Sequence, residues 1–251
     1  IDSGSTDGTA ETAERAGGRV RLQRIDKSRF QHGRTRNLGV ERTEGDVVAF
    51  LTQDALPADD QWLARLVEGF DASDRTALVF GRHRAYPEHG PFVARDLDGL
   101  FDQFRALGTL HSTRLGLPSF IHAGGEEWRR LMAFYSDNNA AVLRTAWRAL
   151  PYPEIDWGED QVLGWEMVRQ GFDKAYAAGA VVFHSHQRPA SEQLQTGVEE
   201  GLLFKREFGL DLVTEAEAAS FLAAMTAAET AFAQGRGLSA GALAMRLESL
   251  R

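Results

Sequence analysis

The chain has 251 residues, 43% hydrophobic and 25% charged, a balance typical of a folded domain whose core needs no metal or disulfide for folding. Cysteine is absent, which excludes a disulfide scaffold, a zinc–thiolate site and a cysteine nucleophile, and is consistent with the cytoplasm. The net charge of −8, from 36 acidic and 28 basic residues, argues against nucleic-acid binding.

The first feature is an acidic turn, residues 2–8 with the sequence DSGSTDG, before a helix predicted over Thr9–Ala16. A strand usually precedes such a turn, so we expect an upstream segment with the first strand to be missing before Ile1. Small residues let the backbone approach a ligand, and the following helix offers a positive N-terminus. A plain turn capped by Thr6 or Asp7 explains the same residues, and the residues alone slightly favour it.

The next elements are a strand predicted over Arg19–Ile25, from its alternating pattern, and a helix predicted over residues 33–43. This helix carries Arg34 and Arg36 in an acidic protein. Arginines bind phosphate oxygens in forked geometry, whereas a solvated helix face would carry the same residues. The two interpretations have equal weight at this point.

A continuous apolar run, Val47–Leu51, predicts a buried parallel strand that ends at Asp54. A helix over 59–70 and a strand over 77–80 follow. This alternation predicts an α/β fold, a mainly parallel sheet with helices on both faces, whose ligands bind beyond the carboxyl ends of the strands. A carboxylate there suits Mg²⁺ or Mn²⁺ bridged to a diphosphate, although a turn aspartate is about equally common.

Further along, a helix is predicted over Arg95–Leu107 and a mobile loop over 108–126. A helix over 159–170 then begins with Glu159 and Asp160. Adjacent helical residues point about 100° apart, so the two carboxylates do not face one atom as in a glycoside hydrolase. One of the two carboxylates is suited to be a general base, and the other is suited to hold the start of the helix or a neighbouring loop. The plain alternative is an acidic first helical turn, which the helix dipole favours.

The last predicted strand, Ala180–Phe183, leads into His184 and His186, which share a face if the strand continues. One of the two histidines is suited to complete a metal shell begun by Asp54. Residues 191–251 are rich in alanine and predict two or three helices, with a capping box formed by Thr214 and Glu217.

In this order the motifs resemble those of the family 2 glycosyltransferases, an inverting group with a GT-A, Rossmann-like fold. The resemblance covers about residues 1–190, and the branch it most resembles is that of bacterial rhamnosyltransferases. The motifs of the family are Asp2-Ser3-Gly4-Ser5-Thr6-Asp7-Gly8-Thr9, Arg36-Asn37-Leu38-Gly39, Thr52-Gln53-Asp54-Ala55 and Gly158-Glu159-Asp160; those of the branch add Phe30, His32, Gly81-Arg82 and His184-Ser185-His186.

The resemblance implies a metal-dependent hexosyltransferase that uses a nucleotide-sugar donor and a saccharide or lipid-linked acceptor in polysaccharide biosynthesis. Its implied roles are a catalytic base, Asp160; metal ligands, Asp54 and His184, for Mg²⁺ or Mn²⁺; nucleotide-binding residues, Asp2, Ser3, Asp7, Arg36 and Asn37; and further candidates, Glu159, His186 and Asn138. The sequence departs from the family pattern in the metal motif, which keeps only its last aspartate, Asp54, with Gln53 before it. It also departs at residues 136–139, which puts the acceptor-side role of Asn138 in doubt.

We therefore predict a GT-A core over 1–190, N-terminally incomplete, and a helical C-terminal region over 191–251. For the C-terminal region three roles stay open: homodimerisation, peripheral contact with the inner face of the membrane, and acceptor binding. The alternative function is a non-catalytic nucleotide-sugar or carbohydrate-binding module. Nucleic acid is not an expected partner.

Overall fold

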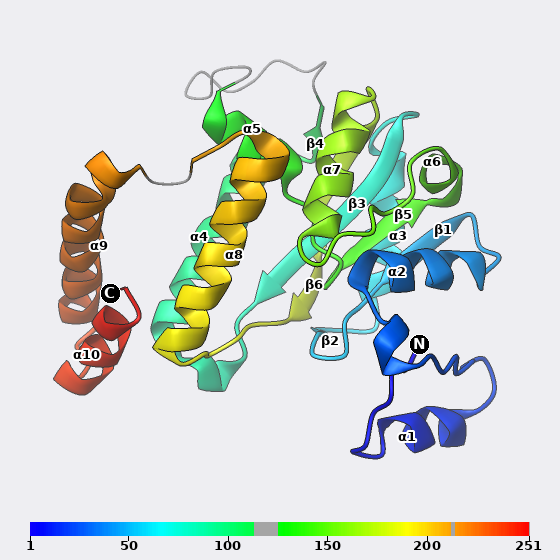
Figure 1. The fold of residues 1–251 in the computed structure, drawn as a ribbon, viewed down its shortest axis with the longest axis horizontal. Helices are drawn as coiled ribbons and strands as arrows, with labels where there is room; N and C mark the ends of the chain where they lie inside the picture. Colours follow the sequence, from blue (N-terminus) through cyan, green and yellow to red (C-terminus); the bar gives the residue numbers. More distant parts are fainter. Residues whose placement is uncertain (113–124, 212–213, 251) are drawn as a thin grey trace.

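The computed structural model describes residues 1–112, 125–211 and 214–250, and shows a central sheet with helices on both faces (Figure 1). The strand order is β1-β5-β3-β6-β2, with β4 also paired to β6. The strands are β1 (Val47–Phe50), β2 (Leu56–Pro57), β3 (Thr76–Arg84), β4 (Leu110–His111), β5 (Ala140–Leu143) and β6 (Asp173–Phe183).

The α/β class predicted from the sequence is confirmed, but the prediction of a mainly parallel sheet needs correction because the sheet is mixed. The long pair β3 and β6 is parallel, whereas β5 runs antiparallel to both β1 and β3. The short strands β2 and β4 are antiparallel to β6. A continuous apolar run reports burial on both faces of a strand and contains no information on the direction of its neighbour.

The helices are α1 (Thr9–Ala16), α2 (His32–Glu41), α3 (Trp62–Glu68), α4 (Gly90–Leu107), α5 (Glu126–Ala133), α6 (Arg144–Ala149), α7 (Glu159–Arg169), α8 (Ala190–Phe208), α9 (Glu215–Gly235) and α10 (Ala240–Glu248). Leu66 of α3 packs on one face of the sheet. Phe101 and Phe104 of α4 pack on the other face, with Met167 of α7. Burial on both faces holds the strand ends that carry polar residues in fixed positions.

Several element boundaries differ from the prediction. The strand expected over Arg19–Ile25 is wrong: Arg24 makes only an isolated bridge to Asp2, and Val20 is 51% exposed. Because this segment has no buried face, its alternating apolar side chains have no core to pack against. The strands expected over 77–80 and 180–183 are longer, β3 and β6. The loop expected over 108–126 includes β4, and its part from 113 to 124 lies outside the described residues.

Of the C-terminal helices, α8 runs along α4, and α9 and α10 lie farther from the sheet (Figure 1). Leu203 and Phe204 of α8 pack with Trp157 and Trp165. Phe232 of α9 packs on Phe92 of α4, with ring centroids 5.4 Å apart. The predicted helical C-terminal region and its capping box at Thr214 are confirmed, and the boundary at 190 stays a prediction. No helix in the described part of the chain has the length and apolarity needed to cross a bilayer.

Candidate active site

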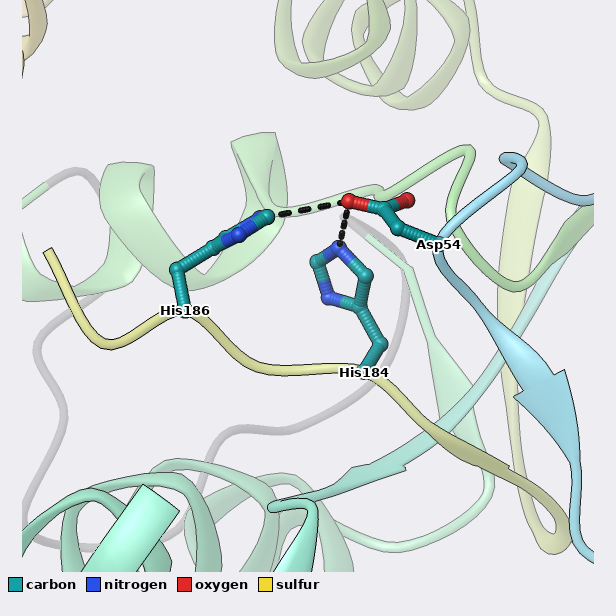
Figure 2. Close-up of side chains that lie close together, drawn as sticks. All are labelled: Asp54, His184 and His186. Carbon is teal, nitrogen blue, oxygen red and sulfur yellow. Dashed lines mark ion pairs between the residues drawn. The ribbon is translucent and has the colours of Figure 1, made fainter. Parts of the chain in front are cut away.

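Asp54, His184 and His186 form a cluster at one edge of the sheet (Figure 2). Both His184 Nε2 and His186 Nε2 lie 3.5 Å from Asp54 Oδ2. One ligand atom from each of the three residues lies within 4.8 Å of the others, close enough to share one ion. Asp54 comes from the loop after β1, and the histidines from the chain just beyond β6.

Two neighbouring side chains orient this cluster. Asn138 Nδ2 lies 3.4 Å from His184 Nδ1, and Asn138 Oδ1 accepts a hydrogen bond from Thr52 Oγ1 at 3.1 Å. This leaves Nε2 of His184 directed at Asp54, as is usual for a histidine whose other nitrogen is held. Burial lowers the pKa of His184 and of His186, which keeps both rings neutral. Burial would raise the pKa of Asp54, but the Thr52 hydroxyl and His184 outweigh it, so the pKa is lowered and the carboxylate stays ionised.

These residues fit a divalent cation. A carboxylate with two neutral imidazoles suits Mn²⁺ better than Mg²⁺, which prefers an all-oxygen shell. The sequence did not show whether His186 belongs to this metal-binding cluster. A position on the same face as His184 does not by itself mean that both rings reach Asp54. The chain turns there so that the two rings stand edge to face, 4.8 Å apart.

A second cluster surrounds Arg36, which projects from α2. Its guanidinium forms ion pairs with Asp137 and with Glu159, both of which are buried. Tyr152 also donates its hydroxyl to Asp137 Oδ1 at 2.7 Å. Burial raises the pKa of Asp137 and of Glu159, and in both cases the Arg36 charge opposes the rise. Arg36 thus fixes two acids in place, at the start of α7 and before β5.

Asp160 follows Glu159 but points to a different environment. Its Oδ1 accepts a hydrogen bond from Gln161 N at 2.8 Å, and its Oδ2 from Asp137 N at 3.3 Å. Burial, followed by the negative charge of Glu159, raises the pKa of Asp160 to about 6. A carboxylate with that pKa is ionised at neutral pH and is basic enough to take a proton.

Both clusters open into one cavity of about 420 Å³, which we call the reaction cavity. Asp54 and Asp160 line the same space, as the sequence argument requires. Glu159, Asn138 and Arg36 also reach it. Its other lining residues are His32, Thr52, Gln53, Ser136, Trp157, Gly158, Gln161, His184, His186 and Arg188.

The candidate nucleotide-binding residues of the N-terminal turn are not among those that line this cavity. Asp2 instead orders its own turn: it accepts hydrogen bonds from Gly4 N at 3.1 Å and from Ser5 N at 3.2 Å. Asp7 accepts one from Thr9 N at 3.0 Å at the start of α1. The roles of Asp2, Ser3 and Asp7 toward a nucleotide stay predictions.

Asn37 differs from its neighbour Arg36 in that its amide binds within the fold. Its Oδ1 accepts from Trp147 Nε1 at 2.8 Å and from Tyr152 N at 3.0 Å, and its Nδ2 donates to Tyr152 O at 2.9 Å. Asn37 therefore helps to fix the segment around Tyr152. The hydroxyl of Tyr152 in turn donates to Asp137. Its predicted contact with a nucleotide stays a prediction.

Sequence reasoning missed Asp137 and Arg188 as parts of the site. Asp137 precedes Asn138 in a polar segment, and nothing in the sequence indicates that it meets Arg36 from a helix about 100 residues away. Arg188 lines the reaction cavity two residues beyond His186, and its charge contributes to lowering the pKa of that histidine. The sequence feature that could have identified Arg188 is its position just after the two histidines that follow a strand.

Residues 1–147 match the sequence profile described as glycosyl transferase family 2. The chain is 32% identical over 218 residues to the O-antigen chain rhamnosyltransferase RfbN of Salmonella typhimurium, an alignment covering 83% of this chain and 65% of the relative. It is 27% identical over 219 residues to the O-antigen chain rhamnosyltransferase WbaN of Salmonella anatum, covering 83% of this chain and 64% of the relative. The chain thus spans slightly less than two thirds of the length of these relatives.

Among solved structures, the fold is similar to mannosyltransferase PcManGT from Pyrobaculum calidifontis in complex with GDP-Man and Mn²⁺. The TM-score is 0.59 with 16% identity, covering 99% of this chain and 73% of that one. It is also similar to S. aureus TarS 1-349 in complex with UDP-GlcNAc, with TM-score 0.54 and 13% identity over 92% of this chain and 70% of that one. At these identities the similarity shows the fold.

Proposed function

The chain belongs to glycosyl transferase family 2, and from that premise we propose that it transfers a sugar from a nucleotide-diphosphate donor to an acceptor hydroxyl. The observation that supports this most is the reaction cavity, which Asp54, His184 and Asp160 line together. A cation-binding cluster and a carboxylate of raised pKa in one cavity are the two requirements of a displacement in which a diphosphate leaves.

The proposed reaction is a single displacement with inversion at the anomeric carbon. Asp160 takes the proton of the acceptor hydroxyl while the oxygen forms its bond to that carbon. The bond from the carbon to the diphosphate oxygen breaks, and the nucleoside diphosphate leaves from the opposite face. Glu159 is unsuited to be the base, because Arg36 holds its carboxylate in an ion pair. Arg36 acts instead as the group that positions Glu159 and Asp137 around Asp160.

A divalent cation is part of the proposal. Asp54, His184 and His186 would hold it, and the two imidazoles favour Mn²⁺ over Mg²⁺. When bound, such an ion offsets the negative charge that develops on a leaving diphosphate. PcManGT, a similar fold, was solved with GDP-Man and Mn²⁺, which supports the choice of ion.

The donor sugar we propose is rhamnose, from a nucleotide-diphosphate donor such as dTDP-rhamnose. The support is the similarity to two O-antigen chain rhamnosyltransferases, RfbN and WbaN. The acceptor we propose is a saccharide, free or lipid-linked, and the compartment is the cytoplasm. Homodimerisation and membrane contact of the C-terminal helices stay predictions.

Replacing Asp160 with Asn tests the assignment of the base. We expect the Asp160→Asn variant to lose about 100-fold or more in transfer from dTDP-rhamnose with Mn²⁺, because general-base catalysis is worth that much. Its affinity for dTDP, measured by calorimetry, should be unchanged. Asp156→Asn is the matched control, since Asp156 is an exposed acid four residues earlier and does not line the reaction cavity.

Full activity of Asp160→Asn would contradict the assigned role. If the unmutated protein binds dTDP but turns over no sugar nucleotide, including UDP and GDP sugars, a non-catalytic nucleotide-sugar-binding module is the better description.

A further inference from the structure

A second cavity of about 520 Å³ adjoins the reaction cavity and shares Asn138, His184 and His186 with it. It lies between α4 and α8, so we call it the α4–α8 cavity; these two helices run side by side in Figure 1. A volume of this size is in the range of sites that hold small-molecule ligands. Arg246 of α10 also reaches the cavity, so the C-terminal region contributes to its wall.

The lining of the α4–α8 cavity combines apolar and hydrogen-bonding groups. Leu97, Leu100 and Phe101 of α4 line it together with Phe134, which gives an apolar side. Gln193, Thr196 and Glu200 of α8 give a polar side opposite. A sugar ring has apolar C–H faces and a rim of hydroxyls, so a cavity with one apolar and one polar side matches it.

Glu200 is the polar lining residue whose carboxyl group can still accept a hydrogen bond from a ligand. Its side chain is half-buried, and it has no hydrogen-bond partner among the residues that the structure describes. Burial raises the pKa of Glu200, and the charge of Arg130 opposes that rise. The carboxyl oxygens of Glu200 accept no hydrogen bond from the described residues and are not fully buried, so they are free to accept one from a ligand in the cavity.

A third cavity adjoins the α4–α8 cavity at Glu200. Glu200, Leu100 and Phe134 also line this third cavity, of about 590 Å³, whose other lining residues include Gln103 and Gln161. The three cavities are neighbours that share lining residues, and they lie along α4 and α8 next to Asp160. A ligand that bound at Glu200 would have room to extend away from the reaction cavity.

Gly197 is an exposed glycine of α8 that lines the α4–α8 cavity. It lies within the helix, and a Cβ atom built on it would meet no other atom within 4 Å. Glycine is unfavourable inside a helix, so neither the helix nor tight packing explains its presence. A side chain at this position would extend into open space at the wall of the cavity.

We propose that the acceptor is a saccharide of more than one sugar unit that binds in the α4–α8 cavity, where Gly197 leaves room for a ring and Glu200 accepts a hydrogen bond from a hydroxyl. The terminal sugar lies next to the reaction cavity, and the following sugar passes Glu200 toward the third cavity. This inference rests on the proposed function, since it names the acceptor of that reaction.

A graded series at position 197 tests the steric part. In transfer from dTDP-rhamnose with Mn²⁺, KM for a saccharide acceptor should rise with side-chain size from Gly197→Ala to Gly197→Leu to Gly197→Phe, by about tenfold or more for Phe. The affinity for dTDP should not follow this trend. Val198→Phe is the control, because Val198 is the next residue of α8, is 53% exposed and lines none of the three cavities. Equal KM values across the series, or an equal effect of Val198→Phe, would overturn the assignment.

Acceptor length and Glu200 test the second part. The probes are methyl glycosides of galactose, mannose, glucose and rhamnose, disaccharides and trisaccharides that end in these sugars, and octyl glycosides of the same monosaccharides. We expect KM to fall from mono- to di- or trisaccharide and Glu200→Ala to abolish that gain. A fall in KM with the octyl chain but not with added sugars would overturn the proposal in favour of an apolar aglycone.

Hydrolysis of dTDP-rhamnose without acceptor separates this inference from the proposed function. If the unmutated protein hydrolyses the donor but uses no saccharide of the panel, the acceptor proposal fails and the proposed transferase stands. If it neither hydrolyses the sugar nucleotides nor binds dTDP, the proposed function itself fails.

Discussion

Glu159 and Asp160 are adjacent at the start of α7, yet the fold gives them different chemistry. Arg36 forms an ion pair with Glu159, whereas Asp160 accepts hydrogen bonds from two backbone N–H groups, Gln161 N and Asp137 N. The two side chains point in different directions around the helix, so Glu159 pairs with Arg36 of α2 and Asp160 with the backbone of Asp137, while both line the reaction cavity. The largely buried guanidinium of Arg36 pairs with Glu159, and this ion pair distinguishes Glu159, the positioning acid, from Asp160, the base.

The raised pKa of Asp160 predicts how transfer depends on pH. A general base acts when ionised, so kcat/KM should fall about tenfold per unit as the pH drops below about 6 and should level off above it. Rates between pH 5 and 8, with dTDP affinity measured over the same range, check this. A plateau that extends down to pH 4.5 would mean that Asp160 is not the group that titrates.

At the scale of elements, β6 holds the end of α5 through a buried lysine. Lys174 is fully buried, and its Nζ donates to Leu131 O at 3.2 Å, to Met132 O at 2.8 Å and to Phe134 O. These carbonyls are at the C-terminal end of α5, where the helix leaves them without partners of its own. The segment they belong to leads directly to Asp137 and Asn138 in the site.

Replacing Lys174 with Met should therefore destabilise the protein, by about 2–4 kcal/mol, since three buried carbonyls lose their partner. Urea unfolding measures the loss. Lys205→Met is the matched control, because Lys205 is exposed and pairs with Asp211 at the surface, and should cost less than about 1 kcal/mol. An unfolding free energy of Lys174→Met equal to that of the control would refute this role.

The same elements show what the sequence could predict. The helix Thr9–Ala16, which ends before two glycines, has the bounds that the sequence predicts. The positions of Asp54 and the two histidines beyond strand ends follow from apolar runs in the sequence. The antiparallel pairing of β5 could not be predicted from the sequence, because the register and direction of a strand depend on neighbours that are distant in the sequence. For the same reason the partners of Arg36 and the bonds of Asn37 to Trp147 and Tyr152 could not be predicted.

At the scale of the whole molecule, a charged cluster docks the last two helices on the core. Glu229 of α9 is buried and pairs with Arg95 of α4 at 2.8 Å and with Arg246 of α10 at 2.9 Å. Arg246 also pairs with Asp96 of α4 at 2.6 Å. Since Arg246 lines the α4–α8 cavity, this cluster connects the position of the C-terminal region to the proposed acceptor site.

Glu229→Gln should loosen this docking while the core stays folded, because Arg95 and Arg246 then lose their shared anion. We expect a loss of about 1–3 kcal/mol and faster cleavage within α9 and α10 in limited proteolysis. Glu215→Gln, which changes an exposed acid in the first turn of α9, should be cleaved as slowly as the unmutated protein. Equal cleavage rates for the two variants would show that the cluster does not hold the helices.

The central claim is that Asp54, His184 and His186 gather a cation beside a bound diphosphate, in the cavity that Asp160 also lines. Anomalous diffraction from crystals grown with Mn²⁺ and dTDP tests it most directly. The account predicts a manganese peak at coordination distance from the side chains of Asp54 and His184, with the diphosphate against the same ion. A nucleotide bound with no such peak, or a peak elsewhere on the protein, would contradict it.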